Sequence, residues 1–126
     1  MDENSSIRGL AERVAAFCDE RDWAQFHNPK DLAIGIATEA GELLDCFRFQ
    51  NAEQVAALFA NPVKRMHIED ELSDVLFFVL RFAGMNGIDL GKALERKLAK
   101  NAANYPVESC RGRNDKHDAY VTPPKQ

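Results

Sequence analysis

Two acidic pairs, Glu39 with Glu42 and Glu71 with Asp74, have residue types and a spacing that could bind a metal ion. Residues three apart in an α-helix lie on nearly the same face, one turn from each other, so each pair presents two neighbouring carboxylates. Two pairs would supply four carboxylates to one site. Such oxygen ligands favour a hard cation, Mg²⁺ or Mn²⁺, whereas a di-iron site would contain Glu-x-x-His pairs, which these acids do not form.

The residues around the acids predict that the carboxylates border the protein core. On a helical wheel Glu39 falls inside an apolar stripe, with Leu32 and Leu43 within roughly 60° of it, and apolar residues likewise flank Glu71. Burying unpaired carboxylates is costly, and four converging acids repel one another, so a bound divalent cation would relieve both problems. The alternative is that all four acids are solvated helix charges. The helix dipole does not explain Glu71, which lies two turns past the predicted helix start at Pro62.

Five helices are predicted to position these side chains. Asn-Pro at residues 28–29 and 61–62 is a helix start signal, Ser5 or Ser6 can cap the first helix, and Asp89 can cap the last. Gly41 lies between two of the acids and costs a helix about 1 kcal/mol relative to Ala, which suggests a close approach there. The predicted helices cover residues 5–21, 29–49, 52–60, 62–85 and 90–104. No segment reads as a strand, and the short connections favour antiparallel neighbours. We therefore predict an all-α, antiparallel helical bundle of four main helices plus a short helix.

Length and composition restrict the class of protein further. A chain of 126 residues with 45% hydrophobic residues is expected to form one domain with its own core. A net charge of −4 argues against nucleic acid or an anionic membrane as the main partner. Three cysteines without metal-ligand spacing suit a reducing compartment, and the polar N-terminus does not resemble a signal peptide, so we expect a cytoplasmic location. The predicted bundle covers residues 1–106, and residues 107–126 form a polar tail whose composition alone predicts disorder.

Three motifs, in this order and spacing, are specific enough to indicate a family. They are Glu20-Arg21-Asp22-Trp23-x-Gln25-Phe26-His27-x-Pro29, then Glu39-x-Gly41-Glu42-Leu43, then Glu71-Leu72-Ser73-Asp74-Val75-Leu76. Through them the chain resembles the MazG-like, all-α nucleoside triphosphate pyrophosphohydrolases, and among these the dCTP pyrophosphatase branch. The resemblance extends from about residue 11 to residue 120 and includes a later match from Asp89-Leu90 to Tyr105-Pro106.

The resemblance implies an activity and a set of site residues. The expected reaction is hydrolysis of a nucleoside triphosphate between the α and β phosphates, giving the monophosphate and pyrophosphate. It implies that all four acids hold Mg²⁺, and we predict that Glu39 and Glu42 are catalytic, with Glu39 as general base. The resemblance also implies that Trp23 stacks on the base, with His27 at or behind the base pocket, and that Phe49 stands where these enzymes commonly place an aromatic residue. The residues expected to meet phosphate or sugar are Lys97, Asn101 and Tyr105. The resemblance also implies that the tail folds over the phosphates through Arg111 and Lys116.

Substrate preference and assembly are expectations of the same kind. Phe49 replaces a common tryptophan, Phe78 stands where a tyrosine can occur, and Val14 replaces a histidine of some relatives. Each change removes a hydrogen bond that could reject a wrong base. These losses loosen the expected specificity for cytosine. The resemblance keeps dCTP or a modified dCTP as the leading substrate, with broader (d)NTP use close behind. The family assembles as dimers or paired dimers, so a homodimer or homotetramer with sites at subunit interfaces is expected. The rival hypotheses are a non-enzymatic regulatory module that binds Mg²⁺ or a nucleotide, and an adaptor bundle.

Overall fold

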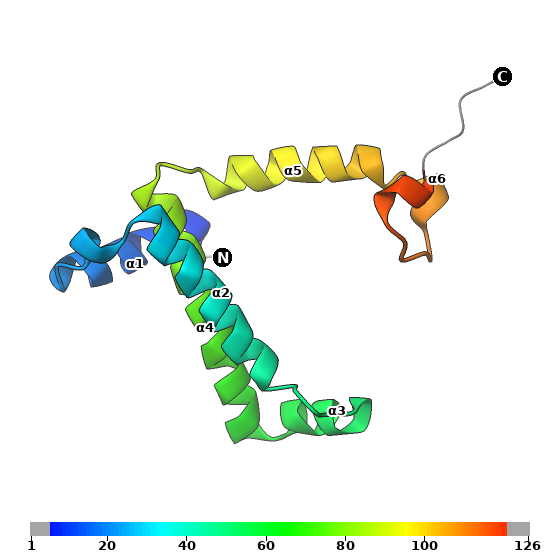
Figure 1. Ribbon diagram of the computed structural model, residues 1–126, viewed down its shortest axis with the longest axis horizontal. Helices are drawn as coiled ribbons and strands as arrows, with labels where there is room; N and C mark the ends of the chain where they lie inside the picture. The colour runs from blue at the N-terminus through cyan, green and yellow to red at the C-terminus, as the bar shows by residue number, and fades with distance from the viewer. Residues whose placement is uncertain (1–5, 121–126) are drawn as a thin grey trace. The chain divides into compact units, whose positions relative to one another are not determined.

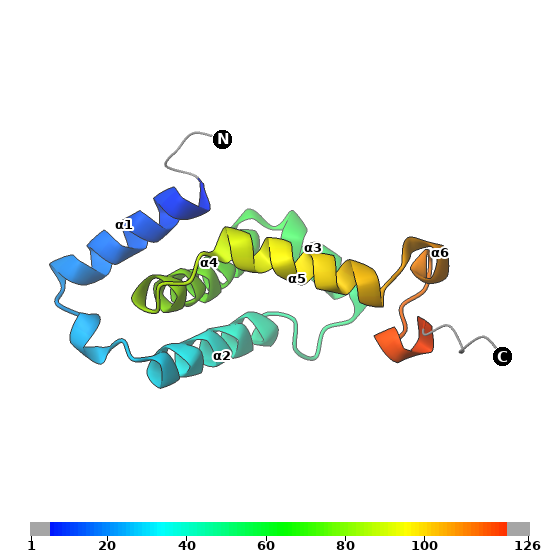
Figure 2. The same cartoon turned by 90° about the horizontal axis from the view of Figure 1, so that it is seen from above.

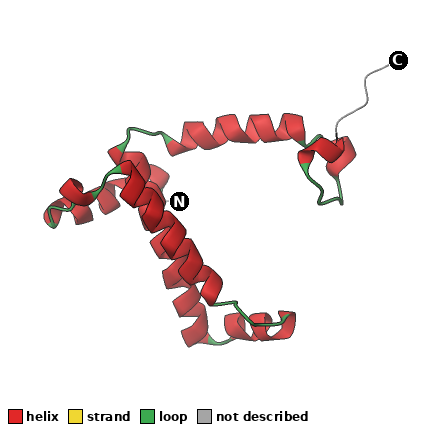
Figure 3. Ribbon diagram, viewed as in Figure 1, coloured by secondary structure: helices red, strands yellow, loops and turns green. Residues whose placement is uncertain are grey.

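The computed structural model describes residues 6–120, and every regular element in that range is helical (Figure 3). This confirms the predicted all-α class. The helices are α1 (Ile7–Glu20), α2 (Pro29–Asp45), α3 (Ala52–Ala60), α4 (Pro62–Met85), α5 (Leu90–Asn104) and α6 (Val107–Cys110), with 3-10 turns η2 (Ala24–Phe26) and η3 (His117–Tyr120). Between residues 6 and 120, no helix combines the length and the apolar character needed to cross a membrane.

The helix starts follow the capping residues of the sequence. Ser6 caps α1 by accepting a hydrogen bond from the Gly9 amide at 3.0 Å, whereas Ser5 lies outside the described residues. Asn28 and Asn61 cap α2 and α4, each followed by proline at the first helical position. Asp89 caps α5 through the Lys92 amide at 3.0 Å. Local chemistry therefore fixes where the helices that carry the acidic pairs begin.

The end of α2 differs from the sequence prediction. The helix was predicted to reach about residue 49, but it ends at Asp45, and residues 46–49 form a turn. In this turn the amides of Cys46 and Phe47 donate to carbonyls three residues back, at 3.2 and 3.0 Å. Phe49 then adopts a left-handed backbone conformation, with φ of 62°, that no regular helix accommodates.

The chain divides into two compact units, residues 1–88 and 89–126. In the first unit α2 and α4 run antiparallel and side by side, and α1 and α3 also pack against α4 (Figures 1 and 2). Gly35 permits the close approach of α2 and α4, because a Cβ added there would lie 2.5 Å from the Phe78 ring. Gly41 was expected to have this role, but a Cβ added there would meet no atom within 4 Å.

The second unit contains α5, α6 and η3. Composition predicted disorder beyond residue 106, but the chain up to Tyr120 is folded against the end of α5. The Tyr120 ring is buried, lies 5.7 Å from the Tyr105 ring, and its hydroxyl accepts a hydrogen bond from the Asp115 amide at 2.9 Å. The aromatic packing explains why a polar segment folds. Residues 121–126 lie outside the described part of the chain.

Candidate metal centre and base-binding residues

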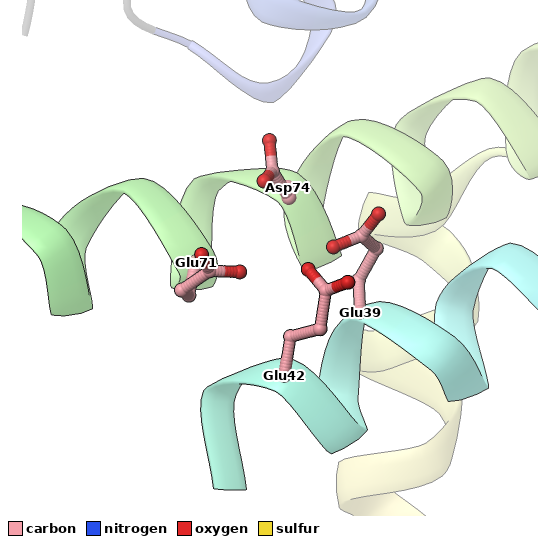
Figure 4. Close-up of side chains that lie close together, drawn as sticks. All are labelled: Glu39, Glu42, Glu71 and Asp74. Carbon is pink, nitrogen blue, oxygen red and sulfur yellow. The ribbon is translucent and has the colours of Figure 1, made fainter. Parts of the chain in front are cut away.

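The two acidic pairs converge between α2 and α4. Because the helices are antiparallel neighbours, Glu39 and Glu42 of α2 face Glu71 and Asp74 of α4 (Figure 4). Each residue offers a carboxylate oxygen, and the four oxygens all lie within 4.8 Å of one another. Glu39 and Glu71 are partly buried, whereas Glu42 and Asp74 are exposed. The cluster therefore has two carboxylates toward the helix interface and two toward solvent.

The carboxylates disturb one another electrostatically. A side-chain hydrogen bond with Glu42, followed by burial and the charges of the other acids, raises the pKa of Glu39 to about 7. Burial, followed by the hydrogen bond and charge of Glu42, raises the pKa of Glu71, against the opposing effect of His67. Ionising all four acids at this separation is therefore costly, and a compensating positive charge would remove that cost.

The donor set fits a divalent cation. Oxygen Oε2 of Glu39 and Oε2 of Glu71 are both buried and have no hydrogen-bond partner. Buried polar atoms in folded proteins are normally satisfied, so unpartnered oxygens that face two further carboxylates fit the coordination of a cation. Four carboxylates without sulfur or imidazole match the preference of Mg²⁺ or Mn²⁺. Binding of such an ion by these residues stays a prediction.

Sequence analysis missed His67, which lies one turn before Glu71 on α4. Its Nδ1 is 3.8 Å from Oε1 of Glu71. The signal was present in the sequence, because residues four apart on a helix are neighbours, in either direction along the chain. His67 also lines a hollow of about 330 Å³ with Cys46, Gln50 and Lys64.

The raised pKa of Glu39 predicts how stability depends on pH without divalent cations. The unfolded chain releases this proton near the ordinary pKa of 4.5, but the folded protein releases it only near 7. The stabilising contribution is therefore complete below about pH 4.5 and lost as the pH rises to about 7. We expect Glu39→Gln to raise the free energy of unfolding at pH 7.5 by roughly 1–2 kcal/mol in EDTA.

Urea denaturation at pH 4.5 and 7.5 in EDTA will measure this effect, with Glu12→Gln on the exposed face of α1 as the control. The advantage of Glu39→Gln should shrink at the lower pH and when Mg²⁺ is added. An advantage of equal size at both pH values would contradict the assigned titration.

Trp23 and His27 lie in the connection between α1 and α2, on either side of η2. Their rings meet edge to face at 6.2 Å, and Trp23 also meets Phe17 of α1 at 5.7 Å. Phe17 contacts Phe77 of α4 at 5.9 Å, so the aromatic residues continue onto the helix that carries Glu71 and Asp74. Trp23 is 37% exposed, which leaves part of its ring free to stack on a ligand.

Sequence analysis also missed Arg81 of α4, which is 4% exposed. Its Nε donates a hydrogen bond to Nδ1 of His27 at 2.8 Å. The available signal was a charged residue next to Leu80 within an apolar stretch of α4, because buried arginines are rare unless paired.

The structure separates Phe49 from Trp23. They flank opposite ends of α2, and a helix of 17 residues is about 25 Å long. Phe49 is 91% exposed and contacts the guanidinium of Arg48 at 4.7 Å. One chain therefore does not bring both aromatic residues to the same base.

The remaining predicted substrate residues lie in the second unit. Lys97 and Asn101 are one turn apart on α5, exposed and half-buried respectively. Tyr105 caps the end of α5 and packs against His117 and Tyr120 of the tail. Exposed side chains in the tail include those of Arg111 and Lys116. Their contacts with a nucleotide stay predictions.

Known proteins resemble both the sequence and the fold. A model of the MazG-like family matches residues 34–118. The chain is 35% identical to dCTP pyrophosphatase 1 from Rattus norvegicus over 85% of its own length and 63% of that protein. It is 33% identical to dCTP pyrophosphatase 1 from Homo sapiens over 89% and 66%. The chain thus spans less than two thirds of these curated relatives. The crystal structure of a pyrophosphatase from Archaeoglobus fulgidus matches with a TM-score of 0.74 and 28% identity, over 84% of this chain and 97% of that one.

Proposed function

The chain belongs to the MazG-like family, and from this premise we propose that it is a Mg²⁺-dependent nucleotide pyrophosphohydrolase. The reaction would cleave a (d)NTP, with dCTP or a modified dCTP as the main substrate, into the monophosphate and pyrophosphate. The names of the relatives support this choice of substrate. The observation that carries the proposal is the convergence of four carboxylates from α2 and α4 within 4.8 Å, with two of their oxygens buried and unpartnered.

The four acids would have two roles, binding the cation and accepting a proton from water. Glu39, Glu42, Glu71 and Asp74 would hold the cation, which when bound would neutralise triphosphate charge and polarise the α-phosphorus. Glu39 is the partly buried acid of the α2 pair, and its carboxylate would accept the proton of the attacking water. Glu42, which shares a hydrogen bond with Glu39, would keep that carboxylate oriented.

The base would be bound at the α1–α2 connection, where it would stack on the exposed part of Trp23, with His27 beside it. Lys97, Asn101, Tyr105, Arg111 and Lys116 are proposed as phosphate and sugar contacts on the strength of the family resemblance. A cytoplasmic location agrees with the three free cysteines, Cys18, Cys46 and Cys110.

We also propose that the protein acts as a homodimer or homotetramer. Leu72 and Leu76 of α4 are 56% and 39% exposed and line an apolar hollow of about 360 Å³ with Val75 and Val79. A second hollow of about 420 Å³ continues from Leu76 to Leu10 and Val14 of α1. A contiguous apolar face of this extent on a soluble protein favours a partner, and a second copy could supply the Phe49 that one chain cannot place beside Trp23.

If the apolar face is the interface between subunits, a charged side chain placed there should prevent the subunits from associating. Leu76→Glu should convert the protein into a monomer, because a carboxylate in an apolar interface has no partner. Met66→Glu is the matched control, since Met66 lies on the same helix, is 64% exposed and is outside both hollows. Sedimentation equilibrium measures the outcome, and a wild-type protein that sediments as a monomer would refute the proposal.

The activity is tested by measuring pyrophosphate release from all canonical and several modified triphosphates, with Mg²⁺ and with EDTA. We expect release to require the cation and to be fastest with dCTP or a modified dCTP. Calorimetry with a non-hydrolysable dCTP analogue separates the rival functions. Metal-dependent nucleotide heat without turnover would indicate a regulatory module, and no such heat would indicate an adaptor.

A further inference from the structure

The buried Arg81 and the partly buried His27 form a contact that the proposed reaction does not yet explain. Arg81 lies near the end of α4, and its Nε–H donates to Nδ1 of His27 across 54 positions of sequence, at 2.8 Å. The guanidinium also lies near Asp19 of α1, whose carboxylate is 3.9 Å from Nη2, beyond hydrogen-bond distance. Nη2 itself is buried without a hydrogen-bond partner.

Stability does not account for a buried arginine in this arrangement. An arginine removed from water needs carboxylates at short distance to recover its hydration, and Asp19 is 69% exposed and not in hydrogen-bond contact. An apolar side chain of similar size would be expected to fill the space at no loss of stability. What only arginine supplies here is a rigid, always protonated Nε–H directed at the imidazole.

The contact determines the protonation state of His27. Arginine has no acceptor, so Nδ1 of His27 must present its lone pair and cannot carry a proton. The imidazole is then neutral, with its proton on Nε2. Burial, together with the charge of Arg81, lowers the pKa of His27, which keeps the ring in this neutral form.

We propose that Arg81 is a positioning residue that fixes His27 with its proton on Nε2, so that His27 offers a hydrogen-bond donor beside Trp23 to an acceptor atom of the nucleobase. This inference rests on the proposed function, in which Trp23 and His27 receive the base. A base with a ring nitrogen or carbonyl oxygen at its contact edge, as in cytosine, accepts such a bond. Without Arg81 the ring would exchange between two tautomers, and one of them would present a lone pair to that acceptor.

The tautomer can be measured without any substrate. Long-range ¹H–¹⁵N correlation spectra of protein labelled at its three histidines report which ring nitrogen is protonated, and His27→Gln assigns the His27 signals. At pH 7.5 we expect Nδ1 of His27 unprotonated and Nε2 protonated. In Arg81→Met the two nitrogens should shift toward the averaged values of exchanging tautomers. In Asp19→Asn, which alters only the more distant neighbour of Arg81, the spectrum should stay as in the wild type.

Kinetics then link the tautomer to base recognition. We expect Arg81→Met to raise KM for dCTP roughly three- to tenfold, the effect of one lost hydrogen bond, with little change in kcat. The KM for 2-deoxyribose 5′-triphosphate, which lacks the base, should be the same in both proteins. Arg81→Lys keeps the charge but loses the planar Nε–H, and it should resemble Arg81→Met in both readouts.

Each outcome decides the inference. A proton on Nδ1 of wild-type His27, or a wild-type tautomer retained in Arg81→Lys, overturns it, and the first result needs no folded variant. An equal rise in KM for the base-free triphosphate also overturns it, because Arg81 would then act on the whole site. If wild-type protein hydrolyses no triphosphate, the proposed function fails, whereas the spectra still test the arginine–histidine contact by themselves.

Discussion

Glu71→Gln is expected to lower kcat/KM for dCTP by at least about a hundredfold, because it removes a ligand charge that no neighbouring residue can replace. Glu71 comes from α4 at the helix interface, and its Oε2 is buried without a partner. A glutamine keeps the shape of the side chain but provides only one neutral oxygen to a cation. Pyrophosphate release at saturating Mg²⁺ measures the loss, and calorimetric titration with Mg²⁺ alone should show weaker binding in the variant.

Glu69→Gln is the matched control for this prediction. Glu69 lies two residues away on the same helix, is 61% exposed and pairs with Arg65 at 3.5 Å. Surface pairs of this kind contribute little, so the variant should retain wild-type activity and Mg²⁺ binding. If Glu71→Gln were as active as Glu69→Gln, the carboxylate cluster would not be the catalytic centre.

Gly35→Ala is expected to destabilise the protein by about 1–2 kcal/mol, although alanine is the better helix former. The new Cβ would lie 2.5 Å from the Phe78 ring. The ring cannot move away freely, because it packs edge to face against Phe77 at 5.5 Å. Either α2 and α4 separate or the aromatic cluster rearranges. Both changes would shift the nearby acids, because Glu39 lies one turn after Gly35 and Asp74 lies one turn before Phe78. Urea denaturation at fixed protein concentration measures the stability, and pyrophosphate release should fall with it.

Gly41→Ala, in the same helix, is expected to have the opposite effect on stability. A Cβ at this position meets no atom within 4 Å, so the substitution should stabilise the folded chain by up to about 1 kcal/mol. A double variant with Gly35→Ala and Phe78→Leu should recover part of the lost stability, since the smaller side chain removes the clash. Equal stability changes for Gly35→Ala and Gly41→Ala would show that the two helices do not approach closely at Gly35.

The sequence by itself determined the features that depend on neighbouring residues. The capping side chains Asn28, Asn61 and Asp89 mark helix starts because each satisfies amides within one turn. The i, i+3 spacing of Glu39 with Glu42, and of Glu71 with Asp74, fixes that each pair shares a helix face. The all-α class and the pairing of acids are consequences of helical periodicity, which needs no tertiary contact.

Only the tertiary structure decided which faces meet. That the acids of α2 and α4 come within 4.8 Å depends on the register of two antiparallel helices, which Gly35 and Phe78 set from a position outside either acidic motif. The hydrogen bond between Arg81 and His27 joins residues 54 positions apart. The tail folds because the Tyr120 ring packs against the Tyr105 ring, although the polar composition of the tail predicted disorder. Contacts between distant segments depend on shape and packing, and local patterns do not contain that information.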